Sequence, residues 1–191
     1  SKSTNHSRIV IEPLERGFGL TLGNAIRRVL LSSLQGAAIT SVKIKGVVHE
    51  FSTIPGVKED LTDILLNLKS VAVKVHSPGL KKMYIKATGP GEIRAGNFET
   101  DSETEIMNKD QLIMTLDSNA DIEIEANIET GKGYVSAEIA EDENKIIGEI
   151  KLDAMFSPVV KATYKIENSR VGQVTDYDKL IFEVETNGVI S

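Results

Sequence analysis

The chain has 191 residues, is 40% hydrophobic and carries a formal net charge of −6. It can therefore bury a core of ordinary size and is predicted to be globular. A free-standing nucleic-acid binder is disfavoured, because phosphate neutralisation needs a clustered Lys/Arg surface that this sequence lacks. The absence of cysteine excludes disulfides and thiolate zinc sites and fits a reducing cytoplasm.

Membrane insertion and export are also disfavoured. No apolar run approaches the roughly 20 residues that cross a bilayer, and the start, SKSTNHSRIV, lacks the charged-then-apolar pattern of a signal peptide. We expect a cytoplasmic protein without a membrane contact.

A glycine-rich segment, GFGLTLG at residues 17–23, precedes the first predicted helix and is similar to the fingerprint of dinucleotide-binding sites. Its spacing is wrong, because three residues separate Gly19 from Gly23 where the fingerprint needs two. Pro13 also interrupts the preceding strand. We interpret Gly17 and Gly19 as permitting a tight turn and Gly23 as allowing another backbone or helix to come close. A small enzyme or nucleotide-binding protein using this turn is the alternative.

An amphipathic helix is predicted over residues 21–34, with Thr21 as its N-cap. Apolar residues three and four apart form one stripe of this helix: Leu22, Ala25, Ile26, Val29, Leu30 and Leu34. Another face carries polar residues and a leucine: Asn24, Arg28, Leu31 and Gln35. An arginine flanked by apolar side chains on a rigid helix suits a protein interface, although ordinary solvated surface is an equally simple interpretation.

The second predicted helix covers residues 59–71. Its apolar stripe consists of Leu61, Ile64, Leu65 and Leu68. Glu59 and Asp60 favour the positive amino-terminal end of the helix dipole.

Strands outnumber these helices. The clearest lies at residues 121–128, where every second residue is apolar. Similar runs occur at residues 42–44, 71–75, 83–85, 112–116, 146–152, 164–166 and 180–184. Many strands with only two convincing helices predict the α+β class, with mainly antiparallel sheet and two amphipathic helices.

Residues that could carry catalysis are scattered. His6, His49 and His76 lack the close spacing of a helical metal pair, and Glu123 and Glu125 lie on an outward strand face. The sequence contains neither a nucleophile-elbow pentapeptide nor a phosphate-binding loop ending in Gly-Lys-Ser or Gly-Lys-Thr. We expect no catalytic residue, metal or cofactor on this chain.

Several blocks together point to one family. They are EPLERGFG at residues 12–19 with its continuation to residue 44, VHEFST at 48–53, EDLTDILLNLKSV at 59–71, GKGY at 131–134, LDAMFSPV at 152–159 and EVETNG at 183–188. In this order they resemble the amino-terminal part of the alpha subunit of bacterial DNA-directed RNA polymerase. Only residues 77–110 diverge from the family.

The resemblance implies a dimerisation and assembly domain made of both chain ends, residues 1–35 and 158–191, interrupted by an inserted α+β domain at residues 36–157. Two copies would pair through the first helix. The residues expected in this homodimer contact are Phe18, Leu22, Ile26, Val29 and Leu30.

The resemblance also implies partner sites. Arg28, with Leu31 and Asn24, matches the position associated with the beta subunit, and Lys69 and Leu152 match positions associated with beta-prime. The Glu141-Asp142-Glu143 segment, a predicted solvated loop tip, resembles a loop that meets activators. Omega and sigma would join later, and the catalytic metal of this nucleotidyltransferase complex would lie on beta-prime.

The family continues beyond residue 191 into a helix, a linker and a small DNA-binding domain, and it also begins earlier. The chain is therefore expected to be a fragment, with DNA contact only through the absent carboxy-terminal domain. The alternative within polymerases is a non-bacterial subunit that pairs with a different small subunit.

Overall fold

The computed structural model describes residues 5–140 and 146–190. The chain divides into two compact units. One, the terminal unit, consists of Ser1–Gln35 and Ser157–Ser191, and the other, the inserted unit, of Gly36–Phe156. Among the described residues seven strand pairs are antiparallel, which confirms the α+β class with mainly antiparallel sheet.

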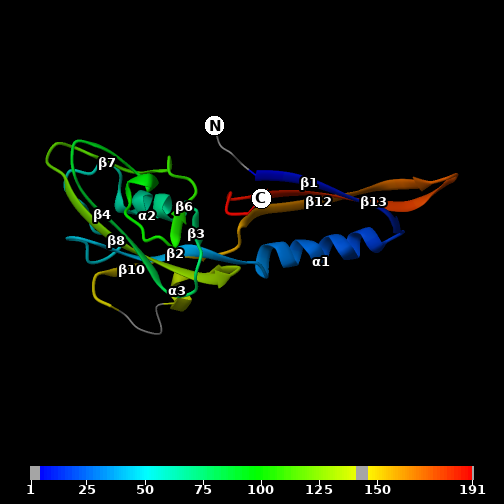
Figure 1. Cartoon of the computed structure of the whole chain (residues 1–191), viewed down its shortest axis with the longest axis horizontal. Coiled ribbons are helices and arrows are strands. Elements are labelled where there is room, and N and C mark those ends of the chain that lie inside the picture. Colours follow the sequence, from blue (N-terminus) through cyan, green and yellow to red (C-terminus); the bar gives the residue numbers. More distant parts are fainter. Residues whose placement is uncertain (1–4, 141–145, 191) are drawn as a thin grey trace. The chain divides into compact units, whose positions relative to one another are not determined.

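The terminal unit is a three-stranded sheet with one helix (Figure 1). Strand β13 (Val174–Thr186) lies between β1 (Asn5–Glu15) and β12 (Val159–Val171), and helix α1 (Phe18–Ser32) packs against β12 and β13. The fully buried members of its core are Val159, Ala162, Leu180, Phe182 and Val184. One face of helix α1 packs against this small core, and the other faces of the helix are exposed.

Helix α1 begins at Phe18, so the prediction of Thr21 as N-cap was wrong. The N-cap is Gly17, which adopts the left-handed conformation (φ 85°) that favours glycine. The backbone N–H groups of Gly17 and Gly19 donate to Asp178 Oδ2 at 2.9 and 3.1 Å. A carboxylate on strand β13 therefore accepts the hydrogen bonds that the first turn of a helix leaves unpaired.

Replacement of Asp178 by alanine is expected to destabilise the protein by about 1–3 kcal/mol, because it leaves one buried and one partly buried N–H group without an acceptor. The free energy of unfolding in denaturant measures this loss. The matched control is Asp176→Ala, which removes only an exposed ion pair with Arg16 (3.0 Å) and should change stability by less than about 1 kcal/mol. Equal effects of the two substitutions would contradict the capping role.

The glycines of α1 let the helix approach its sheet. A Cβ atom built on Gly23 would lie 2.7 Å from Cε2 of Tyr164, and one on Gly19 would lie 3.0 Å from Oδ2 of Asp178. The predicted close approach at Gly23 is confirmed, but the neighbour is an aromatic side chain from β12 and not a backbone or another helix. The glycine-rich segment thus serves helix packing.

The inserted unit contains a four-stranded sheet in the order β10-β2-β8-β4 (Figure 1). These strands are Glu149–Lys151, Gln35–Ile44, Asp121–Lys132 and Lys81–Thr88, respectively. Three two-stranded pairs accompany it: β3 (Val73–Val75) with β6 (Thr104–Ile106), β5 (Gly91–Arg94) with β7 (Leu112–Leu116), and β9 (Tyr134–Val135) with β11 (Ala154–Met155). The strand at residues 121–128 alternates as predicted, with Ile122 and Ile124 buried and Glu123 exposed.

Helix α2 (Leu61–Lys69) supplies much of the core of this unit, and α3 (Ala137–Ala140) and a short 3-10 turn (Ala95–Asn97) are minor elements. All four predicted stripe residues of α2 are buried. The helix is shorter than predicted at both ends. Its N-cap is Asp60. The carboxylate of Glu59 lies outside the helix and accepts the N–H and the hydroxyl of Thr115 at 2.6 and 2.8 Å.

Candidate functional site

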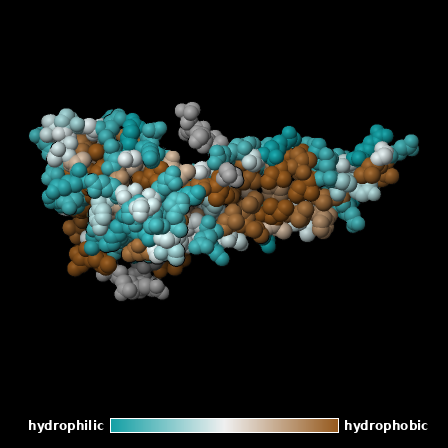
Figure 2. Space-filling model, in the orientation of Figure 1, coloured by the Kyte–Doolittle hydropathy of each residue, from teal (hydrophilic) through white to brown (hydrophobic). Residues whose placement is uncertain are grey.

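The apolar stripe of α1 is divided between the terminal unit's own core and the surface. Leu22, Ile26 and Leu30 are half-buried against that core, whereas Phe18 and Val29 remain 51% and 52% exposed. Apolar surface gathers over this unit in Figure 2. Of the five residues expected in a dimer contact, three already share their surface with the chain's own sheet, and two are largely free.

Strand β1 adds to the exposed apolar surface. Ile9 pairs with Phe182, so the two side chains share the face of the sheet on which α1 packs. Ile9 is nevertheless 49% exposed, because β1 is an edge strand and α1 lies mainly over β12 and β13. Sequence reasoning missed Ile9, whose exposure depends on the lateral position of the helix.

The Arg28 face of α1 is polar and partly tied to the sheet. Arg28 and Asn24 are exposed, and Asn24 Oδ1 accepts a hydrogen bond from the Tyr164 hydroxyl at 2.6 Å. Leu31 is half-buried against the core of the terminal unit. Arg28 therefore points outward from a helix whose side chains on the same face are held in place.

Lys69 and Leu152, which are expected to share one partner site, occupy different environments. Leu152 is only 4% exposed and belongs to the core of the inserted unit. Its neighbour Asp153 lies at the surface and accepts a hydrogen bond from Lys69 Nζ at 3.2 Å. The LDA motif contains this aspartate, but the sequence did not show that it reaches Lys69.

The Asp153 carboxylate also accepts a second hydrogen bond, from the N–H of Ala137 to Oδ1 at 2.8 Å. The Ala137 amide foremost, with the Lys69 ammonium and the Tyr134 hydroxyl, lowers the pKa of Asp153 below its ordinary value. The pKa of the Tyr134 hydroxyl is raised, first by burial and then by this hydrogen-bonded carboxylate.

This lowered pKa gives stability a defined pH dependence. The folded state favours the Asp153 carboxylate more than the unfolded state does, so its contribution is complete above the unfolded pKa of about 3.9 and is lost as pH falls through the lower folded pKa. Asp153→Asn is therefore expected to be less stable than the wild type at pH 6, with the difference shrinking towards pH 3. Denaturant unfolding across this range measures it, with the exposed Asp110→Asn as control. A difference that stays constant with pH would contradict the linkage.

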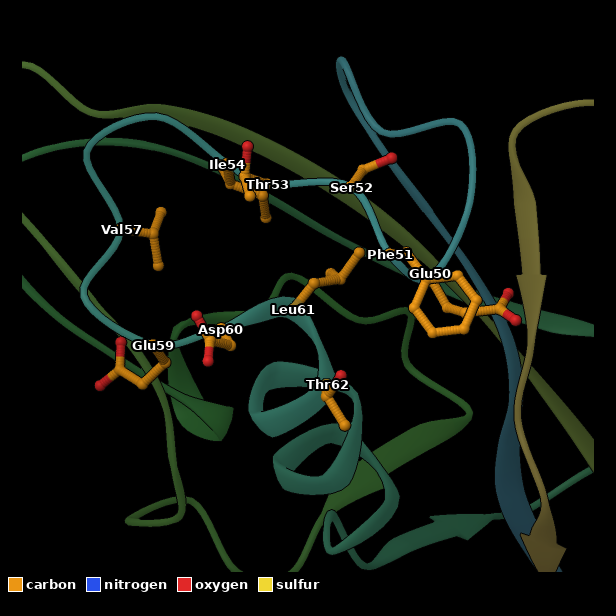
Figure 3. A pocket seen from close by; sticks show the side chains of 10 residues that line it. All are labelled: Glu50, Phe51, Ser52, Thr53, Ile54, Val57, Glu59, Asp60, Leu61 and Thr62. Atoms are coloured by element: carbon orange, nitrogen blue, oxygen red, sulfur yellow. The ribbon is translucent and has the colours of Figure 1, made fainter.

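An open hollow of about 310 Å³ lies beside the start of α2, lined by residues of the 50–62 segment (Figure 3). The turn beside this hollow contains a hydrogen bond from the Phe51 N–H to His49 Nδ1 at 3.2 Å. The Phe51 side chain in this turn is 82% exposed. The Glu59 carboxylate in its lining is already engaged by Thr115. The hollow is thus an open surface feature with an exposed aromatic ring beside it.

Over residues 5–140 and 146–190, no group of three His, Asp or Glu side chains is placed to hold a metal ion. The Glu141-Asp142-Glu143 segment lies outside the described residues. Within the described part of the chain, no helix has the length and apolar character needed to cross a membrane.

Comparisons with known proteins place these surfaces in a family. Residues 42–157 match the model described as the RNA polymerase Rpb3/RpoA insert domain, which defines the class as polymerase subunits that carry this domain. Over 187 residues the chain is 58% identical to the DNA-directed RNA polymerase subunit alpha of Rickettsia felis. The match covers 98% of this chain and 55% of that protein, so the chain spans about half the length of this relative. The chain belongs to the bacterial RNA polymerase alpha subunit family, which confirms the resemblance.

Proposed function

We propose that this chain is the assembly scaffold of a bacterial RNA polymerase in the cytoplasm. It pairs with a second copy of itself and recruits beta and then beta-prime, and omega and sigma join the complex for DNA-templated transcription. Residues 1–35 and 158–191 act as the dimerisation and assembly domain, and residues 36–157 as the inserted domain. The single observation that carries the proposal is helix α1, which presents an exposed apolar side and an exposed arginine in different directions.

The apolar side is the pairing surface. Phe18 and Val29 are separated by about three helical turns and therefore lie on the same side of α1. Ile9 extends this surface onto the edge strand, and Leu22 contributes its remaining exposed area. A fully buried large apolar side chain contributes about 1.5–3 kcal/mol, so a few such residues from each copy suffice to oppose the cost of association.

The arginine side is the beta contact. Arg28 is four residues after Asn24 and three before Leu31, so the three side chains are neighbours on the helix surface. The planar guanidinium offers several donors in a fixed geometry, which suits carboxylates and carbonyls at a partly desolvated interface. Lys69 provides the corresponding contact for beta-prime, while the buried Leu152 acts by supporting the surface above it.

Val29→Asp tests the pairing surface. A charge within the contact should weaken self-association at least about 100-fold, since each copy loses roughly 1.5–3 kcal/mol of burial and gains a desolvation penalty. Sedimentation equilibrium of the purified protein measures the change, and circular dichroism checks the fold. The matched control is Leu20→Asp: Leu20 is 54% exposed and lies about 180° around the helix from Val29.

Equal weakening by the two substitutions, or none by Val29→Asp, would reject this surface. Co-expression with beta and beta-prime tests the whole scaffold, because the purified complex should contain two copies of this chain. A complex with one copy, or with a different small subunit in place of the second copy, would contradict the proposal.

A further inference from the structure

Two donors from different elements converge on the Asp153 carboxylate. Lys69 is the last residue of α2, and Ala137 begins α3. Asp153 itself lies in the short connection between β10 and β11. One carboxylate therefore joins three segments of the inserted unit at its surface.

The ion pair sets the direction of the Lys69 side chain. A lysine carries a flexible four-carbon stem and three donor hydrogens, so a free one samples many orientations. Here one donor is held by Asp153 at 3.2 Å, and the side chain keeps 32% of its surface exposed. Among the described residues Asp153 is the acceptor found for the ammonium group, which leaves its other hydrogens for acceptors on another protein.

Apolar side chains border this polar centre. Leu66 precedes Lys69 by about one helical turn, and Met155 is the cross-strand partner of Tyr134. Leu66, Tyr134 and Met155 are 52%, 59% and 53% exposed, although each is large enough to be buried in a core. Directly behind Asp153, Leu152 fixes the backbone in the core at 4% exposure.

We infer that Asp153 is a positioning residue for the contact made by Lys69: its carboxylate orients the ammonium group towards the incoming beta-prime subunit. This inference rests on the proposed function, which assigns Lys69 to that contact. The partner surface that fits is one that supplies a carboxylate or carbonyl acceptor to Lys69 and apolar side chains to Leu66 and Met155.

Asp153→Asn isolates this role. The amide oxygen of asparagine can still accept the Ala137 N–H, so the connection to α3 is retained, whereas the charge that holds Lys69 is removed. A double-mutant cycle with Lys69→Ala is measured as the affinity of the preformed complex of two alpha chains and beta for purified beta-prime. Each single substitution should weaken the binding of beta-prime about tenfold or more. The double variant should bind beta-prime no more weakly than the weaker-binding of the two single variants, because Asp153 acts through Lys69.

The matched control is the ion pair of Lys82 with Glu125 (2.8 Å), which lies on the same unit and is also partly exposed. Lys82→Ala and Glu125→Gln should leave the affinity within about twofold, as expected for surface positions outside the contact. Asp153→Glu restores a carboxylate and should recover part of the lost affinity. A second readout needs no partner. The rate at which an amine-reactive acylating reagent modifies Lys69, measured by mass spectrometry, should be higher in Asp153→Asn than in the wild type.

The outcomes separate the two levels of inference. If Lys69→Ala binds beta-prime as the wild type does, the assignment of Lys69 under the proposed function is wrong. If Lys69→Ala weakens binding but Asp153→Asn does not, or if the two effects add in full, the positioning role of Asp153 is wrong while the Lys69 contact stands. An unchanged acylation rate in Asp153→Asn would likewise overturn the positioning role.

Discussion

Arg28→Ala is expected to abolish recruitment of the beta subunit while leaving the fold and self-association intact. Arg28 is exposed, so its truncation should change the free energy of unfolding by less than about 0.5 kcal/mol. At an interface, the loss of a central arginine costs about 2–4 kcal/mol, which corresponds to a 30- to 1,000-fold loss of affinity. Pull-down of purified beta by the chain measures recruitment, and sedimentation measures pairing.

The neighbouring Arg27→Ala is the matched control, because Arg27 is also exposed but points about 100° away around the helix. Arg28→Lys keeps the charge and removes the planar donor fork, so it should restore only part of the affinity. Normal recruitment by Arg28→Ala would defeat the assignment of this residue. Failure of the variant to fold would show instead that Arg28 has a structural role.

Gly23→Val is expected to produce the largest loss of stability among single substitutions in α1, about 3 kcal/mol. Even the first added carbon would lie 2.7 Å from Cε2 and 2.8 Å from Cδ2 of Tyr164. The ring cannot easily move aside, because it packs on Phe182 with centroids 5.5 Å apart and its hydroxyl bonds Asn24. Overpacking of this kind costs about 1–3 kcal/mol and occasionally more, which exceeds the small gain in helix propensity over glycine.

The denaturant midpoint measures this loss. Ala25→Val places the same side chain on the exposed side of α1 and should cost less than about 1 kcal/mol. Combining Gly23→Val with Tyr164→Ala should be less destabilising than the sum of the two single effects, since the second substitution removes the clashing ring. A stable Gly23→Val protein, or full additivity, would show that the close packing of α1 on β12 is not required.

The hydrophobic period of each long element was readable from its own residues. The buried stripe of α2 consists of Leu61, Ile64, Leu65 and Leu68, because apolar side chains three and four apart meet on one helix face. Residues 121–128 alternate because a half-buried strand has a period of two. The wrong glycine spacing at Gly19 and Gly23 likewise argued against a dinucleotide fingerprint and for close packing.

Other features depended on residues that are far apart in the sequence. The start of α1 at Phe18 requires Asp178, and the surface around Lys69 requires Asp153. Short strands such as β9 and β11 are too brief to show a period and exist only because they pair with each other. The burial of Leu152 also became evident only when the sheet and α2 were assembled around it.

The amino-acid sequence by itself therefore determined the class, the family and the apolar faces, because local periodicity and motif order are properties of neighbouring residues. The tertiary structure decided which of those apolar residues stay exposed, which carboxylate caps α1 and which one holds Lys69. Those outcomes depend on contacts between segments that approach one another only in the folded chain, and their geometry is not encoded in any local pattern.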